Sequence, residues 1–316
     1  MRLGQWWLLG IVAAALGLVS CAPFSRDIPY TTLERRYANG ASQYMDMSDG
    51  VRMHYRIQGD AEAPAIILVH GFGASVHAWE PWVERLGARY RIISVDLPGH
   101  GLTRAPARYR FSAISNAQLI GELAQNLNVQ RFILVGHSMG GAVAVRFALR
   151  EPEKLDALVL VAPAAWPRGE STGRPPFVFR LLSNPLGRAI VRHINPRLFA
   201  ERGLASAYND PDMVQEGVID RYVDLARAPG HRALLSSGRD NAEIPLRAED
   251  FADIAVATLV MHGEGDRIIS VEDSRALAAA LPSARLVVYP DVGHLPMEEA
   301  PDQSAADVRA FLEALR

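Results

Sequence analysis

The sequence RFILVGHSMGG occupies residues 131–141 and decides the fold that the rest of the chain has to build. Its FILV part is an apolar run typical of a buried strand, and the residues after the second glycine favour a helix. Gly136 and Gly140 permit a sharp turn between the two, so Ser138 can adopt a strained backbone conformation with its hydroxyl exposed. The free N–H groups of a helix start favour developing negative charge there. This context predicts that Ser138 is a nucleophile.

Short apolar runs recur along the chain, and most of them are separated by segments with helical patterns. Continuous apolar runs suit strands that are covered on both faces, as in a parallel sheet. The alternation of strand and helix therefore predicts the fold class: α/β, a doubly wound, mostly parallel eight-stranded sheet. The runs are residues 65–69, 91–95, 132–135, 157–161, 258–261 and 286–289, and the helical segments are 79–86, 112–127, 141–150, 271–281 and 303–315.

The first two strands have a different pattern. Residues 51–58 alternate between apolar and polar side chains, which predicts a strand with one buried and one exposed face. Residues 44–48 can pair with it as an antiparallel hairpin through Asp49 and Gly50. The side chains predicted to face solvent are Arg52, His54, Arg56 and Gln58.

One connection is far longer than the others. Residues 164–256 separate two core strands, whereas such connections normally take a few residues. This segment is rich in aromatic residues and reads as mostly helical, so we expect a cap inserted over the carboxyl ends of the strands. The predicted α/β core is then residues 44–163 and 257–316.

Ligands of doubly wound sheets bind at the carboxyl ends of the strands, so a base for Ser138 is sought there. His294 follows the final strand in a loop at this edge, and the chain order Ser, Asp or Glu, His places the base last. It is therefore the predicted general base. Of the other histidines, four adjoin glycines in turns at strand ends, where a role in structure or in supporting the site residues is the better expectation: His70, His100, His137 and His262. The remaining four lie in the second strand (His54), a loop (His77) and the predicted cap (His193 and His231).

The acid that orients this base should lie between the two and follow a strand. Asp266 comes directly after residues 258–261, where its carboxylate could accept the Nδ1–H of His294. Glu264 is the close competitor. The alternative position, at the end of the preceding strand, holds Ala162, Pro163 and Ala164 and so offers no carboxylate. Asp266 is the predicted acid.

An oxyanion hole requires backbone N–H donors, so its signature is glycine and turn geometry. The sequence HGFG at residues 70–73 follows the strand at 65–69. The expected donors are the amide of Phe72 and the amide of Met139, one residue after the nucleophile.

The amino terminus predicts export. Residues 6–19 are an apolar run that is short for a membrane span and suits the core of a signal peptide at residues 1–20. The tetrad Leu18-Val19-Ser20-Cys21 resembles the lipobox of bacterial lipoproteins, which implies lipidation of Cys21. A polar tether at residues 21–43 would then link the enzyme to a bacterial membrane of the cell envelope, facing the periplasm or exterior. An ordinary signal peptide or a short membrane anchor is the alternative.

Composition excludes several classes of protein. The chain has 316 residues with a formal net charge of −2, which gives no electrostatic reason to expect nucleic-acid binding. Cys21 is the only cysteine, so an intrachain disulfide is impossible. No metal-ligand cluster of cysteines and histidines is present, and no cofactor is implied.

Together these motifs resemble those of the α/β-hydrolase superfamily, in the capped group that includes carboxylesterases, lipases and carbon–carbon bond hydrolases. The resemblance covers residues 44–316 and is vaguest in the cap. It rests on HGFG at 70–73, DLPGHG at 96–101, GHSMGG at 136–141, GEGD at 263–266, and GHLP at 293–296 with Glu299 and Pro301 behind.

The resemblance implies a serine hydrolase of carboxylic esters that acts through an acyl-enzyme on a small apolar substrate. The haloalkane dehalogenases and epoxide hydrolases of this fold use an Asp nucleophile, so Ser138 argues against both activities. The meta-cleavage carbon–carbon hydrolases typically have Asn where this chain has His137, and they stay open as an alternative, as does amide hydrolysis with the same triad. A non-catalytic member that binds a ligand is the third hypothesis. The oligomeric state is not predicted.

Overall fold

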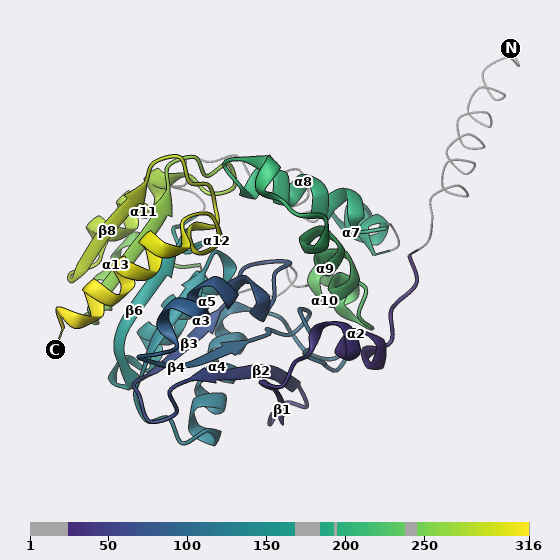
Figure 1. Cartoon of the computed structure of the whole chain (residues 1–316), viewed down its shortest axis with the longest axis horizontal. Helices are drawn as coiled ribbons and strands as arrows, with labels where there is room; N and C mark the ends of the chain where they lie inside the picture. The colour runs from purple at the N-terminus through teal and green to yellow at the C-terminus, as the bar shows by residue number, and fades with distance from the viewer. Residues whose placement is uncertain (1–24, 168–183, 193–194, 238–244, 316) are drawn as a thin grey trace, which may run out of the picture.

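The computed structural model describes residues 25–167, 184–192, 195–237 and 245–315, and Figure 1 shows how they are arranged. The predicted signal peptide and Cys21 lie outside the described residues. Among the helices that are described, none is long and apolar enough to cross a membrane.

Within the described residues, eight strands form a central sheet in the order β1-β2-β4-β3-β5-β6-β7-β8. β1 and β2 pair antiparallel, as does β2 with β4, and the remaining pairs are parallel. The predicted fold class is confirmed. The strands are β1 (Ser42–Asp46), β2 (Arg52–Gly59), β3 (Ala65–Val69), β4 (Arg91–Val95), β5 (Phe132–His137), β6 (Leu155–Val161), β7 (Thr258–Gly263) and β8 (Ala284–Tyr289).

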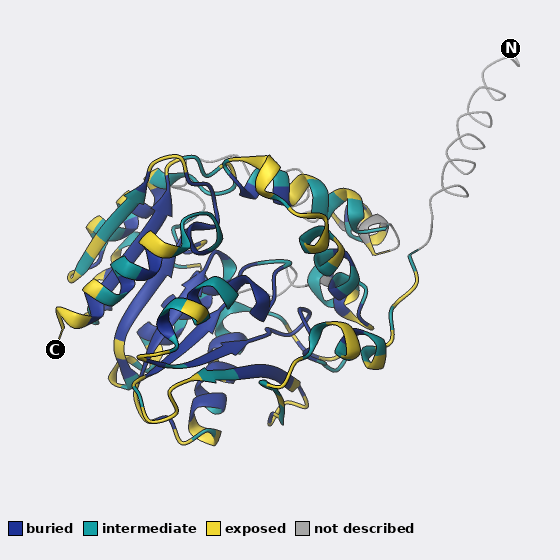
Figure 2. Cartoon of the chain, viewed as in Figure 1, coloured by how far each residue is buried: buried dark blue, intermediate teal, exposed yellow. Residues whose placement is uncertain are grey.

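Helices cover both faces of this sheet. Side chains of α4, α5 and α11 share one hydrophobic cluster with the sheet, and those of α3, α12 and α13 share the other. The central strands, β3 to β7, are mostly buried between these two layers of helices (Figure 2). The helices are α3 (Glu80–Leu86), α4 (Ala113–Asn126), α5 (Met139–Arg150), α11 (Val271–Ala280), α12 (Pro296–Glu299) and α13 (Pro301–Glu313).

β3 shows why these strands read as unbroken apolar runs. Ile67 and Val69 pack into the cluster beneath α4 and α5, whereas Ile66 and Leu68 pack into the cluster beneath α3 and α13. All four are fully buried. Successive side chains of a strand point to opposite faces, so a sheet covered twice selects apolar residues at every position.

Arg52 of β2 is exposed as predicted and Gln58 is half-buried, but the exposure predicted for the middle of this face is wrong. His54 and Arg56 are buried. The Arg56 guanidinium donates to Glu80 Oε1 at 2.9 Å and to the Tyr37 carbonyl at 2.7 Å, and His54 Nδ1 donates to Asp96 Oδ2 at 2.6 Å. Hydrogen-bonding partners from distant segments let these polar side chains be buried, and the alternation of residue types could not reveal those partners.

Four helices of the predicted cap are described between β6 and β7. Together with α2, they lie on the side of the molecule away from α13 (Figure 1). α8 and α9 pack against each other, as do α7 and α10. The short 3₁₀ helix η4 (Ala248–Asp253) packs instead on α11 of the core. The cap helices are α7 (Pro185–Val191), α8 (Arg197–Ala207), α9 (Glu216–Ala226) and α10 (His231–Ser237).

A helix that the sequence patterns did not predict lies inside the expected tether. α2 (Tyr30–Tyr37) packs against α9, and Arg36 forms an ion pair with Asp224 at 2.6 Å. On its other side, Glu34 pairs with Arg104 of the core at 2.6 Å. α2 thus connects the cap to the core.

The side chain of Asp96 joins the segments that carry Val76 and Leu102, and a substitution tests how much this contributes to stability. Its buried carboxylate accepts the N–H groups of Val76 and Leu102, both at 2.8 Å, and the Nδ1–H of His54. Asp96→Asn should lower the free energy of unfolding in urea by about 3 kcal/mol, because one partner of a buried pair is removed. Asp156→Asn, at an exposed ion pair, should cost under about 1 kcal/mol. Equal losses in the two variants would contradict this interpretation.

Candidate active site

Ser138 lies at the turn between β5 and α5 with φ 51° and ψ −116°, a positive φ that non-glycine residues rarely adopt. The turn is too tight for larger neighbours: a Cβ at Gly136 would lie 2.3 Å from the Gly140 carbonyl oxygen. The Ser138 carbonyl accepts the N–H groups of Gly141 and Ala164, both at 2.9 Å. These contacts fix the strained conformation in place.

The structure brings two of the predicted residues into direct contact. His294 Nδ1 lies 2.6 Å from Asp266 Oδ2, and both side chains are almost fully buried. A carboxylate oxygen can only accept, so Nδ1 carries the hydrogen and Nε2 is left as the acceptor that a general base needs. The competing carboxylate of Glu264 is exposed.

The carboxylate of Asp266 is surrounded by donors. Oδ1 accepts the N–H groups of Ile268 at 2.7 Å and Ile269 at 3.0 Å, and Oδ2 is also 3.0 Å from His262 Nε2. Burial by itself would raise the pKa of Asp266, but the facing His294 and the hydrogen bonds from both histidines outweigh it and hold the pKa well below its ordinary value. Asp266 is therefore ionised beside His294 at neutral pH.

His137 connects the serine turn to the loop of His294. Its Nε2–H donates to the His294 carbonyl at 2.9 Å, and the two rings lie 4.7 Å apart. Burial, followed by the facing charge of His294, lowers the pKa of His137 well below its ordinary value. A neutral imidazole therefore fixes the distance between the two loops without adding a second positive charge to the site.

The loop after β3 lies against the serine. A Cβ at Gly71 would come within 2.7 Å of His137 Nδ1 and 3.0 Å of Ser138 Cβ. Phe72 is the next residue of this loop, and Met139 is the first residue of α5, where helix geometry leaves the N–H without an intrahelical acceptor. Both residues predicted for the oxyanion hole thus belong to segments that adjoin Ser138.

The sequence patterns did not predict that the cap helps to hold the base. The His294 N–H donates to the Ala207 carbonyl at the end of α8, at 2.6 Å. Glu299 accepts the Gly293 N–H at 2.9 Å through one oxygen and the Asn209 N–H at 2.7 Å through the other. Glu299 follows the GHLP motif at residues 293–296. Its partner in the cap, Asn209, lies 90 residues away in the chain, so no local sequence signal identifies this contact.

Most described aromatic residues of the cap have packing or hydrogen-bonding roles. Trp166 stacks on Phe251 with ring centroids 5.6 Å apart, and Tyr208 donates to Glu298 at 2.6 Å. Tyr222 differs because its ring would lie 3.8 Å from a Cβ at Gly73, next to the predicted oxyanion loop. Two further aromatic residues, Phe177 and Phe179, lie outside the described residues.

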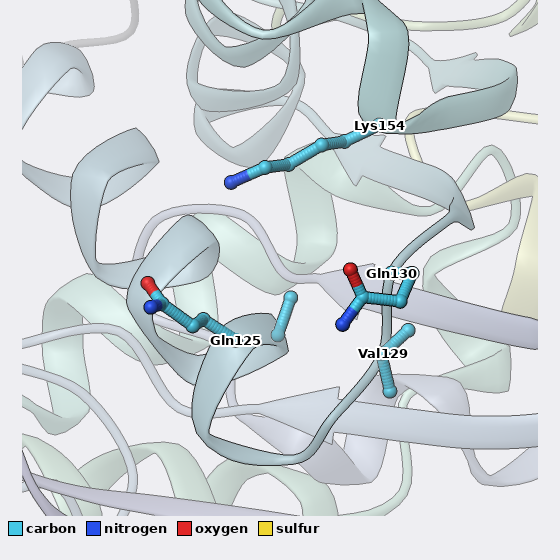
Figure 3. Close-up of a pocket in the computed structure, with 5 residues that line it drawn as sticks. Gln125, Val129, Gln130 and Lys154 are labelled. Atoms are coloured by element: carbon cyan, nitrogen blue, oxygen red, sulfur yellow. The ribbon is translucent and has the colours of Figure 1, made fainter.

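A surface pocket of about 280 Å³ lies at the amino ends of the strands, opposite the ends that carry the site residues (Figure 3). Gln130 and Lys154 line it just before β5 and β6 begin, so it is separated from Ser138 by the length of a strand. Lys154 is already paired with Glu151 at 2.6 Å. Within the described ranges, no group of three or more His, Cys, Asp or Glu side chains could hold a metal ion.

Residues 66–307 match the sequence profile of the alpha/beta hydrolase family, and this match spans most of the chain. The chain belongs to the alpha/beta hydrolase family. One relative is a protein of Comamonas testosteroni, named 2-hydroxy-6-oxononadienedioate/2-hydroxy-6-oxononatrienedioate hydrolase. The two sequences are 28% identical, over 77% of this chain and 85% of the relative.

Two solved structures resemble this alpha/beta hydrolase. A bacterial membrane phospholipase A is 25% identical, covers 99% of this chain and 98% of its own, and has a TM-score of 0.73. A thermophilic esterase from Thermogutta terrifontis is 26% identical, covers 87% of this chain and 98% of its own, and has a TM-score of 0.72. Similar hydrolases thus act on different bonds, so the family alone leaves the substrate class open.

The lowered pKa of Asp266 makes the stability of this hydrolase depend on pH. Because the folded pKa lies below the unfolded value of about 3.8, the carboxylate contributes stability above that value and loses it as the pH falls toward the folded pKa. In urea unfolding between about pH 3 and 7, Asp266→Asn should therefore show a shallower loss of free energy on the acid side than the parent. Asp156→Asn is the exposed control. A slope unchanged in Asp266→Asn would contradict the shift.

Proposed function

We propose that this chain is a serine hydrolase of carboxylic esters. The observation that carries the proposal is the strained Ser138 turn, tied through His137 to the loop of a His294 whose Nδ1–H is held by the ionised Asp266. A serine is a weak nucleophile by itself and needs an adjacent base with a free acceptor nitrogen.

In the proposed reaction, Ser138 Oγ attacks the ester carbonyl while His294 Nε2 takes its proton. Asp266 stabilises the imidazolium that results, and the amides of Phe72 and Met139 hydrogen-bond the tetrahedral oxyanion. The imidazolium returns the proton to the leaving alcohol. Water then attacks the acyl-enzyme with the same base, which releases the acid and restores Ser138.

Two observations favour an ester over a carbon–carbon bond. The similarity to the membrane phospholipase A extends over 99% of this chain, beyond the family match at residues 66–307. His137 also stands where the meta-cleavage hydrolases typically have Asn. The similarity to a named meta-cleavage hydrolase favours the alternative, a carbon–carbon bond hydrolase with the same three residues. Both use Ser138, so a substrate panel has to separate them.

Ser138→Ala should retain the fold and lower kcat for a p-nitrophenyl ester by a factor on the order of 10⁶, because the nucleophile is lost. A fluorophosphonate should label the parent at Ser138 and leave the variant unlabelled. The panel should contain p-nitrophenyl esters of increasing acyl length and a meta-cleavage dienoate. Near-parental turnover in Ser138→Ala would falsify the assignment, and turnover of the dienoate alone would establish the carbon–carbon alternative.

The protein is further proposed to be lipid-anchored through Cys21 at the surface of a bacterial membrane. The apolar run at residues 6–19, which ends two residues before this cysteine, supports the proposal. Figure 1 shows that the described chain begins beside α2 and the cap, so an anchor would be attached at the cap side of the enzyme.

Cys21→Ser expressed in a bacterial host should lose metabolic labelling with palmitate and leave the membrane fraction, because the thiol that carries the lipid is absent. Multiple acyl chains hold a protein firmly, whereas one chain binds only marginally. The activity of the variant should match that of the parent. Labelling of Cys21→Ser equal to the parent, or a free thiol in the membrane-bound parent, would contradict lipidation.

A further inference from the structure

A second histidine contacts the carboxylate that orients the base. His262 is the last residue but one of β7, is completely buried, and places Nε2 3.0 Å from Asp266 Oδ2. This is the same oxygen that accepts from His294 Nδ1 at 2.6 Å. Two imidazoles therefore share one carboxylate oxygen, and the reaction proposed above uses only one of them.

The surroundings of His262 fix its tautomer. Nε2 faces two acceptors, Asp266 Oδ2 and the Ile269 carbonyl at 3.2 Å, so this nitrogen carries the hydrogen. Nδ1 lies 2.6 Å from Ser274 Oγ, which can therefore donate its hydroxyl hydrogen to the bare nitrogen. Ser274 belongs to α11 and is buried as well. Both ring nitrogens of His262 are thus hydrogen-bonded, and a hydroxyl from α11 fixes the orientation of the ring.

We propose that His262 is a positioning residue for the catalytic acid, oriented by Ser274. The N–H groups of Ile268 and Ile269 hold Oδ1 of Asp266, and the Nε2–H of His262 holds Oδ2. Three fixed donors leave the carboxylate one orientation, in which Oδ2 faces His294. This inference rests on the proposed function, because it assigns His262 a part in the triad of that reaction.

If His262 served packing alone, an apolar side chain that fills the same space would leave the activity unchanged. Under the proposal, that side chain leaves Oδ2 with one donor, so the carboxylate can turn away from His294. The misplaced imidazole would affect the chemical step and leave substrate binding unchanged. Partners that orient a reactive group from behind typically contribute 10-fold to 100-fold to activity in metal sites, and we expect the lower end here.

The test compares His262→Leu with His262→Gln in the full-length protein, since the Gln amide can still donate to Asp266. Measured are kcat and KM for a p-nitrophenyl ester and the rate at which a fluorophosphonate labels Ser138. His262→Leu should lower kcat and the labelling rate about tenfold with KM unchanged, and His262→Gln should restore most of the loss. Thr258→Val, which removes a buried hydroxyl from the other end of β7, is the matched control.

Ser274→Ala keeps the test decisive if His262→Leu fails to fold. This variant removes only the hydroxyl that orients His262, so kcat and labelling should fall several-fold without a change in KM. Parental labelling rates in a folded His262→Leu, or in Ser274→Ala where the former does not fold, would overturn the inference. Failure of the parent itself to react with the fluorophosphonate would instead overturn the proposed function.

Discussion

The backbone turn at Ser138 is the constraint on which the rest of the site depends. A positive φ at a serine costs on the order of 1–3 kcal/mol and persists only where surrounding contacts enforce it. β5 lies at the centre of the sheet, between β3 and β6, and α5 packs back onto it. The two glycines flanking the turn allow this close packing. The sheet therefore sets the position of the hydroxyl, and the other site residues have to be brought to it.

Those residues arrive on loops, and each loop is held by buried polar contacts. Asp266 is fixed by two backbone N–H groups and two imidazoles, while the loop of His294 is fixed by Glu299, His137 and the Ala207 carbonyl. The last contact comes from the cap. A change in the position of α8 would therefore move the base as well as the substrate site, so substitutions at this end of the cap should alter kcat together with KM.

The sequence predicted best what depends on local pattern. Residues 65–69 and 91–95 coincide with β3 and β4, because strands covered on both faces carry mainly apolar residues. The Asp266–His294 pair was expected from chain order and strand ends, and the structure places the two side chains in contact. What could not be predicted depends on distant partners: the burial of Arg56 by Tyr37 and Glu80, and the packing of α2 on α9. The two residues of such a contact lie far apart in the chain, so no local sequence pattern contains both.

A second Asp–His pair shows why geometry around the pair decides its function. His54 Nδ1 donates to Asp96 at 2.6 Å, the same distance as in the Asp266–His294 pair, and each carboxylate also accepts two backbone N–H groups. His54 Nε2, however, is buried and has no hydrogen-bond partner among the described residues. His294 instead adjoins the turn that carries Ser138. The same hydrogen bond therefore stabilises a turn at one strand end and orients a base at another, and the neighbouring serine makes the difference.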